Sequence, residues 1–176
     1  MRLKCWMQWG ALAFVLVAGS ACGSKYIKND ELYEDQPAFR IDKKAEIRDN
    51  TRNRKVLDVL ARYRRALVEK DFGALKRLIA EDYYDNGGTT ATTDDNYGRE
   101  KVVASFERLA NYAEDIEYKV TVKDLTYERN RAKLRYEYEY AYKYTVGEKP
   151  SWDAGVELNE LEVVQKDGSW KIVSGL

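Results

Sequence analysis

The chain has 176 residues, with 30 basic and 30 acidic side chains and no histidine. This length favours one domain with a sizeable core, and 44% hydrophobic with 34% charged residues is typical of a globular domain in water. The balanced charge leaves no basic excess for phosphates, so we expect no nucleic-acid partner. Without histidine the chain lacks the commonest general base and metal ligand, so any catalysis must rest on Asp, Glu, Tyr, Lys or Ser.

Residues 1–21 have the three parts of an export signal. Arg2 and Lys4 give a positive start, and an apolar run follows that ends in small residues directly before Cys22. This segment resembles the lipobox of bacterial lipoproteins, although the family usually has Leu where this chain has Gly19. The resemblance implies cleavage before Cys22 and a lipid on its thiol, which would anchor the protein in a membrane.

Two other interpretations of this segment remain. Trp6 to Ala21 could be an uncleaved span, but 16 residues that include Gln8 are short for a bilayer. The segment could also be an ordinary cleaved signal. By resemblance to the enterobacterial sorting rule, Gly23 after the cysteine implies the outer membrane, facing the periplasm. A lipid on Cys22 would leave the mature chain without a thiol for a disulfide.

Residues 22–53 are polar and show no sustained apolar period. We expect a solvated tether between the lipid and the domain. Isolated apolar or aromatic residues could instead dock onto the domain; these are Tyr26, Ile27, Tyr33, Phe39 and Ile41.

Three helices are expected first. Apolar residues recur on one face of residues 54–70, and Asp71 can cap a second helix over 72–82. Turn-forming residues over 85–98 predict a loop, in which Thr89–Thr93 could form a short strand. A third helix is predicted from Arg99 to Tyr112.

Strands follow the helices, because the apolar period changes to two after residue 115. The alternation predicts strands that begin near Ile116, at Ala132, near Trp152 and at Ser169, with a hairpin turn at residues 166–168. The apolar set changes parity near Asn159 and Glu160, which predicts a β-bulge there. Helices followed by antiparallel strands indicate an α+β fold, with the helices on one face of a curved sheet.

Residues 54–176 resemble a nuclear transport factor 2-like (SnoaL-like) domain. The resemblance rests on two helices ending in Asp82-Tyr83-Tyr84, a Gly-rich loop, and Tyr97-Gly98-Arg99-Glu100 opening a third helix. It also rests on the long strands and on the final run from Asp167 to Leu176. The family implies a cone-shaped domain in which three helices and a concave sheet enclose a pocket. It also implies a possible homodimer through the convex sheet face.

Five tyrosines occupy alternate positions of one predicted strand, so they project from one face. These are Tyr136, Tyr138, Tyr140, Tyr142 and Tyr144. Core packing explains them most simply, since tyrosine favours strands and buries a large area. A ligand-pocket wall and an exposed patch for a protein partner are the alternatives.

The residues that would face a ligand are Tyr84, Asp85, Tyr136, Tyr138, Tyr140 and Glu160. In the resembling family, catalysis often pairs a pocket carboxylate with a tyrosine, as in ketosteroid isomerase. Glu160 is the best-placed such carboxylate if it lies at a bulge; Asp85, Asp153 and Glu157 are weaker candidates. We assign no catalytic residue, because none can be paired with a proton to move. Trp152 and Trp170 are expected to be core anchors.

The loop from Asp85 to Asn96 contains oxygen ligands but lacks the order of a calcium-binding loop, so we expect no metal and no cofactor. The favoured interpretation is a non-catalytic, lipid-anchored envelope protein that binds a small apolar ligand or a protein partner. The alternatives are an isomerase or cyclase that uses a carboxylate with a tyrosine, and a scaffold component of an envelope complex. The fold alone does not separate them, because it hosts all three.

Overall fold

The computed structural model describes residues 26–28, 36–87 and 96–176. The export signal, Cys22 and the segment Thr89–Thr93 lie outside the described residues. Among those that are described, no helix is long and apolar enough to cross a membrane.

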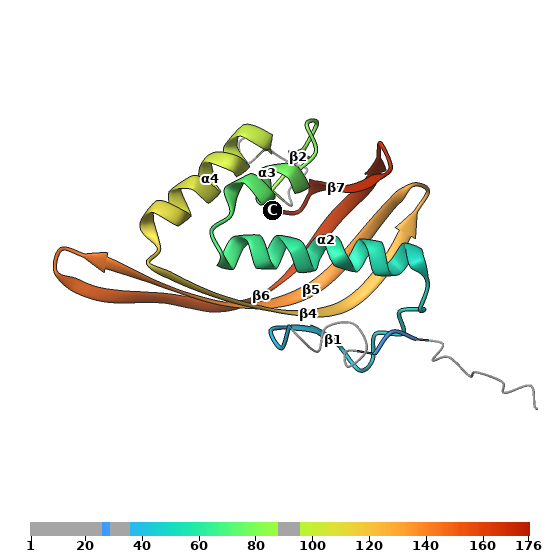
Figure 1. Ribbon diagram of the computed structural model, residues 1–176, viewed down its shortest axis with the longest axis horizontal. Coiled ribbons are helices and arrows are strands. Elements are labelled where there is room, and N and C mark those ends of the chain that lie inside the picture. The colour runs from blue at the N-terminus through green and yellow to red at the C-terminus, as the bar shows by residue number, and fades with distance from the viewer. Residues whose placement is uncertain (1–25, 29–35, 88–95) are drawn as a thin grey trace, which may run out of the picture.

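A curved five-stranded sheet with the order β1-β4-β5-β6-β7 organises the domain (Figure 1). Its strands are β1 (Phe39–Ile41), β4 (Asp115–Glu128), β5 (Arg131–Val146), β6 (Lys149–Lys166) and β7 (Ser169–Ser174). The strands from β4 to β7 pair antiparallel, whereas β1 runs parallel to β4. A separate two-stranded ladder joins β2 (Tyr84–Asp85) to β3 (Tyr97–Gly98), at the two ends of the stretch 85–98 that was expected to be a loop.

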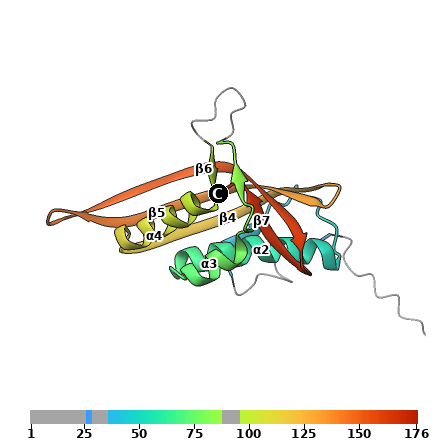
Figure 2. The ribbon, with the colours of Figure 1, turned by 90° about the horizontal axis from the view of Figure 1, so that it is seen from above.

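Three helices lie over one face of the sheet, as Figures 1 and 2 show. They are α2 (Thr51–Val68), α3 (Phe72–Leu78) and α4 (Arg99–Tyr112). The predicted α+β fold is confirmed, with the difference that β1 makes the sheet mixed. Asp71 caps α3 as expected, because its side chain accepts a hydrogen bond from the Ala74 N–H at 2.8 Å.

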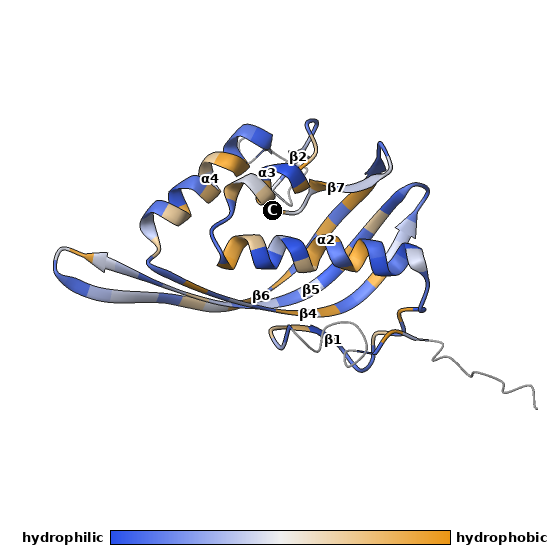
Figure 3. Cartoon of the chain, viewed as in Figure 1, coloured by the Kyte–Doolittle hydropathy of each residue, from blue (hydrophilic) through white to orange (hydrophobic). Residues whose placement is uncertain are grey.

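The core lies between α2 and the concave face of the sheet. Val56 and Leu60 of α2 are fully buried, as are Leu134 of β5 and Leu161 of β6. Figure 3 shows apolar bands that alternate with hydrophilic ones along α2 and along the strands beneath it. Burial of each such side chain stabilises the fold by about 1.5–3 kcal/mol.

Part of the expected tether is built into the domain. Phe39 and Ile41 are 1% and 5% exposed, and β1 pairs with residues 120–122 of β4. Ile27 and Ile47 are also buried, and the Ile27 N–H donates to the Ile47 carbonyl at 2.9 Å. The expected domain start at residue 54 is therefore too late. The docking alternative holds for Ile27, Phe39 and Ile41, because each supplies apolar surface that the core covers.

The predicted bulge at Asn159 and Glu160 is wrong. The β5–β6 register runs without a shift through Tyr136–Asn159 and Arg135–Glu160. Shifts occur instead in β4, between Val122 and Asp124, and in β6 against β7, between Glu162 and Val163. The change of parity has another cause, which is that β6 carries apolar residues on both faces. Val156 and Leu158 are 63% and 69% exposed on the convex face, whereas Leu161 is buried on the concave face.

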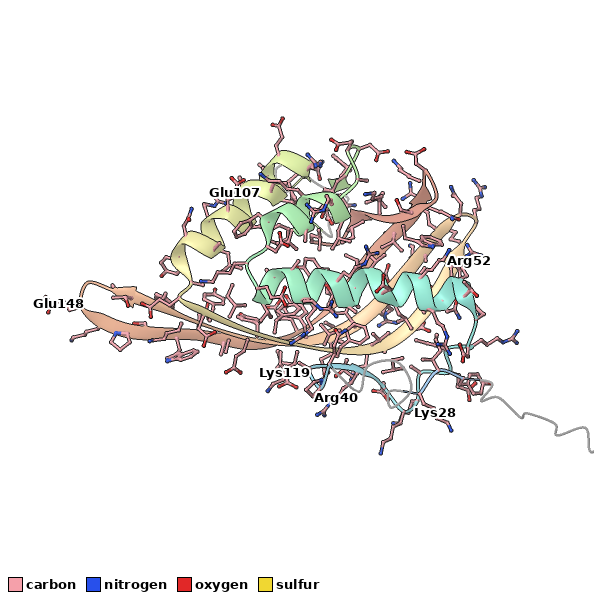
Figure 4. All side chains as sticks on the ribbon, in the orientation of Figure 1. Lys28, Arg40, Arg52, Glu107, Lys119 and Glu148 are labelled. Carbon is pink, nitrogen blue, oxygen red and sulfur yellow. The ribbon has the colours of Figure 1, made fainter. Side chains whose placement is uncertain are left out.

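The β5–β6 hairpin extends past the C-terminal end of α4, and Figure 4 shows Glu148 at its far end. The concave side of the hairpin therefore lies partly beneath α4 and partly beyond it. This geometry creates a gradient of burial along β5.

Candidate functional site

The tyrosines of β5 divide into one core residue and four half-buried ones. Tyr136 is fully buried, whereas the other four are half-buried; we call these four the tyrosine row, and they are Tyr138, Tyr140, Tyr142 and Tyr144. Successive ring centroids along the row are 5.8–6.3 Å apart. The row continues onto other elements, because Tyr118 of β4 stacks on Tyr138 at 5.1 Å and Tyr112 of α4 stacks on Tyr144 at 4.7 Å.

The inner end of the row is closed by packing. Tyr63 of α2 and Tyr118 are 6% and 8% exposed, and their rings meet edge to face at 6.2 Å. The Asn159 side-chain amide donates to the Tyr136 hydroxyl at 3.1 Å and to the Gly175 carbonyl at 2.9 Å. For Tyr136 the core interpretation therefore holds, because its ring and its hydroxyl are both satisfied within the fold.

Two tyrosines of the row are hydrogen-bonded to carboxylates on the neighbouring strand, β6. The Tyr138 hydroxyl donates to Glu157 Oε2 at 2.5 Å, and the Tyr142 hydroxyl donates to Asp153 Oδ2 at 2.5 Å. Both pairs are register partners in β5 and β6, so both carboxylates share the concave face with the row. Between the pairs, Gly155 lets the Tyr140 ring lie close, since a Cβ there would be 2.8 Å from its hydroxyl.

The tyrosine hydroxyls stay protonated far into the alkaline range. Burial, and then the Glu157 carboxylate, raises the pKa of Tyr138 well above its ordinary value. The hydrogen bond to Asp153, followed by burial, raises the pKa of Tyr142 to about 12. Each hydroxyl is thus a neutral donor at ordinary pH. The second oxygen of each carboxylate has no hydrogen-bond or ion-pair partner within the described ranges.

Asp85, expected to face a ligand, instead holds the end of β7. Its side chain is 7% exposed and accepts hydrogen bonds from Gly87 N at 2.9 Å, Ser174 Oγ at 3.0 Å and Gly175 N at 2.5 Å. The Tyr83 hydroxyl adds a fourth donor at 3.3 Å. A carboxylate with four donors is a structural anchor. The neighbouring Tyr84, also expected to face a ligand, is 56% exposed outside the row.

Glu160 does not belong to the site. It is on the convex face, where its carboxylate lies 3.8 Å from Lys133 Nζ, because no bulge turns it over. The structure brings Tyr138 and Tyr140 together with Glu157 and Asp153, which were only weaker candidates in the sequence. Both carboxylates occupy odd-numbered positions of β6, which share one face of the strand. This pattern would have selected them if a continuous β5–β6 register had been assumed.

The two tryptophans differ in role. Trp170 is 5% exposed and is the expected core anchor, whereas Trp152 is 55% exposed on the convex face and is not. The sequence could not separate them, since both occupy predicted strands.

No group of three or more Asp, Glu, Cys or His side chains could hold an ion in the part of the chain that the structure describes.

Neither a family model nor a curated protein matches the sequence. Solved structures match its fold. A protein from Streptomyces avermitilis, named as a candidate dehydratase of the nuclear transport factor 2-like family, has a TM-score of 0.56 at 14% identity, over 69% of this chain and 91% of its own. A candidate scytalone dehydratase from Novosphingobium aromaticivorans has a TM-score of 0.55 at 16% identity, over 69% of this chain and 79% of its own. A conserved protein from Planctomyces limnophilus has a TM-score of 0.56 at 18% identity, over 69% of this chain and 90% of its own.

These likenesses define the fold, which is the nuclear transport factor 2-like cone. In this chain the deep part of the cone is filled by Tyr63, Tyr118 and Tyr136. The tyrosine row, with its two carboxylates, is the part of the concave face that remains partly open. It can bind a ligand with an apolar body against the rings and a donor toward the carboxylates.

Proposed function

We propose that this protein is a non-catalytic, lipid-anchored envelope lipoprotein whose domain binds a small, largely apolar ligand on the tyrosine row. The observation that carries the proposal is the row itself: four half-buried aromatic rings beside two carboxylates that each keep an unpartnered oxygen. The ligand would cover the rings and donate hydrogen bonds to Glu157 and Asp153.

Binding without catalysis is favoured because the polar groups are poorly placed for acid–base work. Glu157 and Asp153 are both exposed to water, whereas a catalytic carboxylate is usually enclosed so that its proton affinity can be tuned. The tyrosine hydroxyls already donate to these carboxylates, so neither is free to polarise a substrate carbonyl.

The ligand site can be tested with N-phenyl-1-naphthylamine, an uncharged apolar dye that fluoresces when it leaves water. We expect Tyr140→Ala with Tyr142→Ala to weaken dye binding at least tenfold, because the ring surface is lost. Tyr84→Ala is the matched control, as Tyr84 is exposed outside the row. Equal dye binding by the wild type and the double variant would show that the tyrosine row is not the ligand site.

The anchor can be tested by mass spectrometry of the protein extracted from membranes. A diacylglyceryl modification on Cys22 as the first residue supports the proposal, as does loss of membrane association in Cys22→Ser. An unmodified chain that begins elsewhere contradicts it.

One observation favours an enzymatic alternative of the isomerase or cyclase type. Tyr138 and Glu157 bring a hydroxyl donor and a potential base within 2.5 Å of each other. A β,γ-unsaturated cyclic ketone offers an acidic C–H and gives a conjugated product that absorbs in the ultraviolet. Turnover by the wild type that Glu157→Gln abolishes would establish this alternative, and equal rates for both proteins would reject it.

A protein partner, including a second copy of the chain, would use the convex face. Trp152, Val156 and Leu158 are exposed there on alternate positions of β6. We propose a homodimer through this face, to be measured by sedimentation. Val156→Lys with Leu158→Lys should yield monomer, and a wild-type protein that is already monomeric at high concentration rejects the dimer. Pull-down of the lipidated protein tests the scaffold role; recovery of no stable partner would exclude it.

A further inference from the structure

A groove of about 420 Å3 lies between α2, α3 and β7, and none of its lining residues belongs to the tyrosine row. Its walls carry four basic side chains, and we call it the basic groove; they are Arg62, Arg65, Arg77 and Lys171. Its floor is apolar and consists of Ala66, Ala74, Leu78 and Trp170. The groove is therefore both cationic and partly apolar.

Two acids, Glu69 and Asp71, also line the groove. The four basic side chains therefore exceed the acidic ones by two charges. Asp71 is already engaged, because its carboxylate accepts the Ala74 N–H at 2.8 Å at the start of α3. Two of the basic groups are engaged as well. Arg62 pairs with Asp58 at 2.8 Å, and Lys171 Nζ donates to the Arg77 carbonyl at 2.5 Å.

Arg65 and Arg77 are different, since neither guanidinium has a hydrogen-bond or ion-pair partner in the described part of the chain. They come from separate helices, and each lies in the last turn of its helix. The negative end of a helix dipole stabilises a cation there, so the fold tolerates both arginines without a carboxylate partner. Each guanidinium presents a planar set of donors that suits a carboxylate, sulfonate or phosphate.

We propose that the basic groove binds an amphiphilic anion, with its acidic group between Arg65 and Arg77 and its apolar body on the floor near Trp170. The volume lies within the range of small-molecule sites. This site differs in charge from the tyrosine row, whose two carboxylates would repel the same ligand. The inference does not depend on the function proposed for the row.

The test uses 8-anilinonaphthalene-1-sulfonate, the anionic relative of the uncharged dye used for the row. We expect Arg65→Gln with Arg77→Gln to weaken its binding at least tenfold, and binding to the wild type to weaken as salt is raised. Arg135→Gln, on the exposed convex face, is the matched control and should bind as the wild type does. Equal affinity for the wild type and the double variant overturns the proposal.

Competition separates the parts of the ligand and its source. Octyl sulfate should displace the anionic dye, and octyl glucoside, which has the same chain without the charge, should not. If inorganic sulfate displaces the dye as effectively as octyl sulfate does, the apolar chain adds nothing, and the proposal of an amphiphilic ligand is wrong. Vesicles of phosphatidylglycerol that displace the dye would assign a lipid as the source, and displacement by soluble octyl sulfate alone would assign a free anion.

Folding does not confound this test. Arg65 and Arg77 are exposed and unpaired, so their replacement should leave the thermal midpoint unchanged. The single variant Arg77→Gln gives a second measurement and should lose part of the affinity. The uncharged dye should bind the arginine double variant as it binds the wild type, because it reports the tyrosine row. Loss of only one dye therefore shows which of the two proposals fails.

Discussion

Tyr138 and Glu157 lie directly opposite each other on β5 and β6, and their side chains form a hydrogen bond of 2.5 Å across the concave face. This hydrogen bond directs the Tyr138 hydroxyl toward the neighbouring strand β6. Tyr142 and Asp153 repeat the arrangement four residues further along β5. The row thus presents its carboxylates beside the rings, at a fixed spacing that the strand imposes.

The first prediction concerns the titration of Tyr142. Asp153 raises the pKa of Tyr142 to about 12 mainly through their hydrogen bond. Asp153→Asn keeps an acceptor but removes the charge, so we expect the pKa to fall toward the ordinary value of 10. The near-ultraviolet absorbance of tyrosinate measures this shift, and Tyr142→Phe should remove the same transition. An unchanged titration in Asp153→Asn would contradict the pairing.

Stability should also fall at alkaline pH. Burial raises the pKa of Tyr136 to about 12, whereas the unfolded chain has the ordinary value of 10. A raised folded pKa contributes stability that is complete below pH 10 and lost as the pH rises from 10 toward 12. Denaturant midpoints measured across this window should decline, and the decline should be smaller in Tyr136→Phe, which has no proton to release there.

Tyr136 should matter more for its ring than for its hydroxyl. Tyr136→Phe removes the hydrogen bond with Asn159, at a cost of about 0.5–1.5 kcal/mol. Tyr136→Ala empties a fully buried site and should cost about 3–5 kcal/mol. Equilibrium denaturation in urea gives both values. Similar costs for the two variants would contradict the burial of the ring.

Asp85 should be important for stability. Asp85→Ala leaves Gly175 N, Ser174 Oγ and Gly87 N without their acceptor, so we expect a loss of about 2–4 kcal/mol. The control is Asp58→Ala, which breaks an exposed pair with Arg62 and should cost less than about 1 kcal/mol. If both variants unfold at the same denaturant concentration, Asp85 is not an anchor.

Gly155 and Tyr140 should be coupled. A methyl group at Gly155 would lie 2.8 Å from the Tyr140 hydroxyl, so Gly155→Ala must displace that ring. We expect a cost of about 1 kcal/mol that largely disappears when Tyr140 is already alanine. A double-mutant cycle on unfolding free energies measures this coupling. Additive costs would show that the ring does not cover the glycine.

The faces of β6 should respond in opposite ways. Leu158→Ala, at 69% exposure, should change stability by less than about 0.5 kcal/mol, whereas Leu161→Ala removes a fully buried side chain at about 2–5 kcal/mol. Urea midpoints at low protein concentration make the comparison. A large cost at Leu158 would mean that a bulge does turn β6 over.

The sequence by itself determined the three helices and the strands from β4 to β7, in their order along the chain. Local periodicity is set by backbone geometry, so α4 begins and ends at the predicted Arg99 and Tyr112, and β7 begins at the predicted Ser169. The same periodicity placed five tyrosines on one face of β5. It did not reveal that Phe39 and Ile41 form a strand, because a short parallel edge strand depends on its partner β4.

Only the tertiary structure decided which residues form the site. The alternation along β6 is compatible with either face, and the continuous pairing with β5 put Glu157 beside Tyr138 and Glu160 on the convex face. Tyr136 is buried in the core that α2 covers, while Tyr142 lies nearer the turn of the β5–β6 hairpin. The bond from Gly175 N to Asp85 joins positions 90 residues apart, a distance that no local pattern spans.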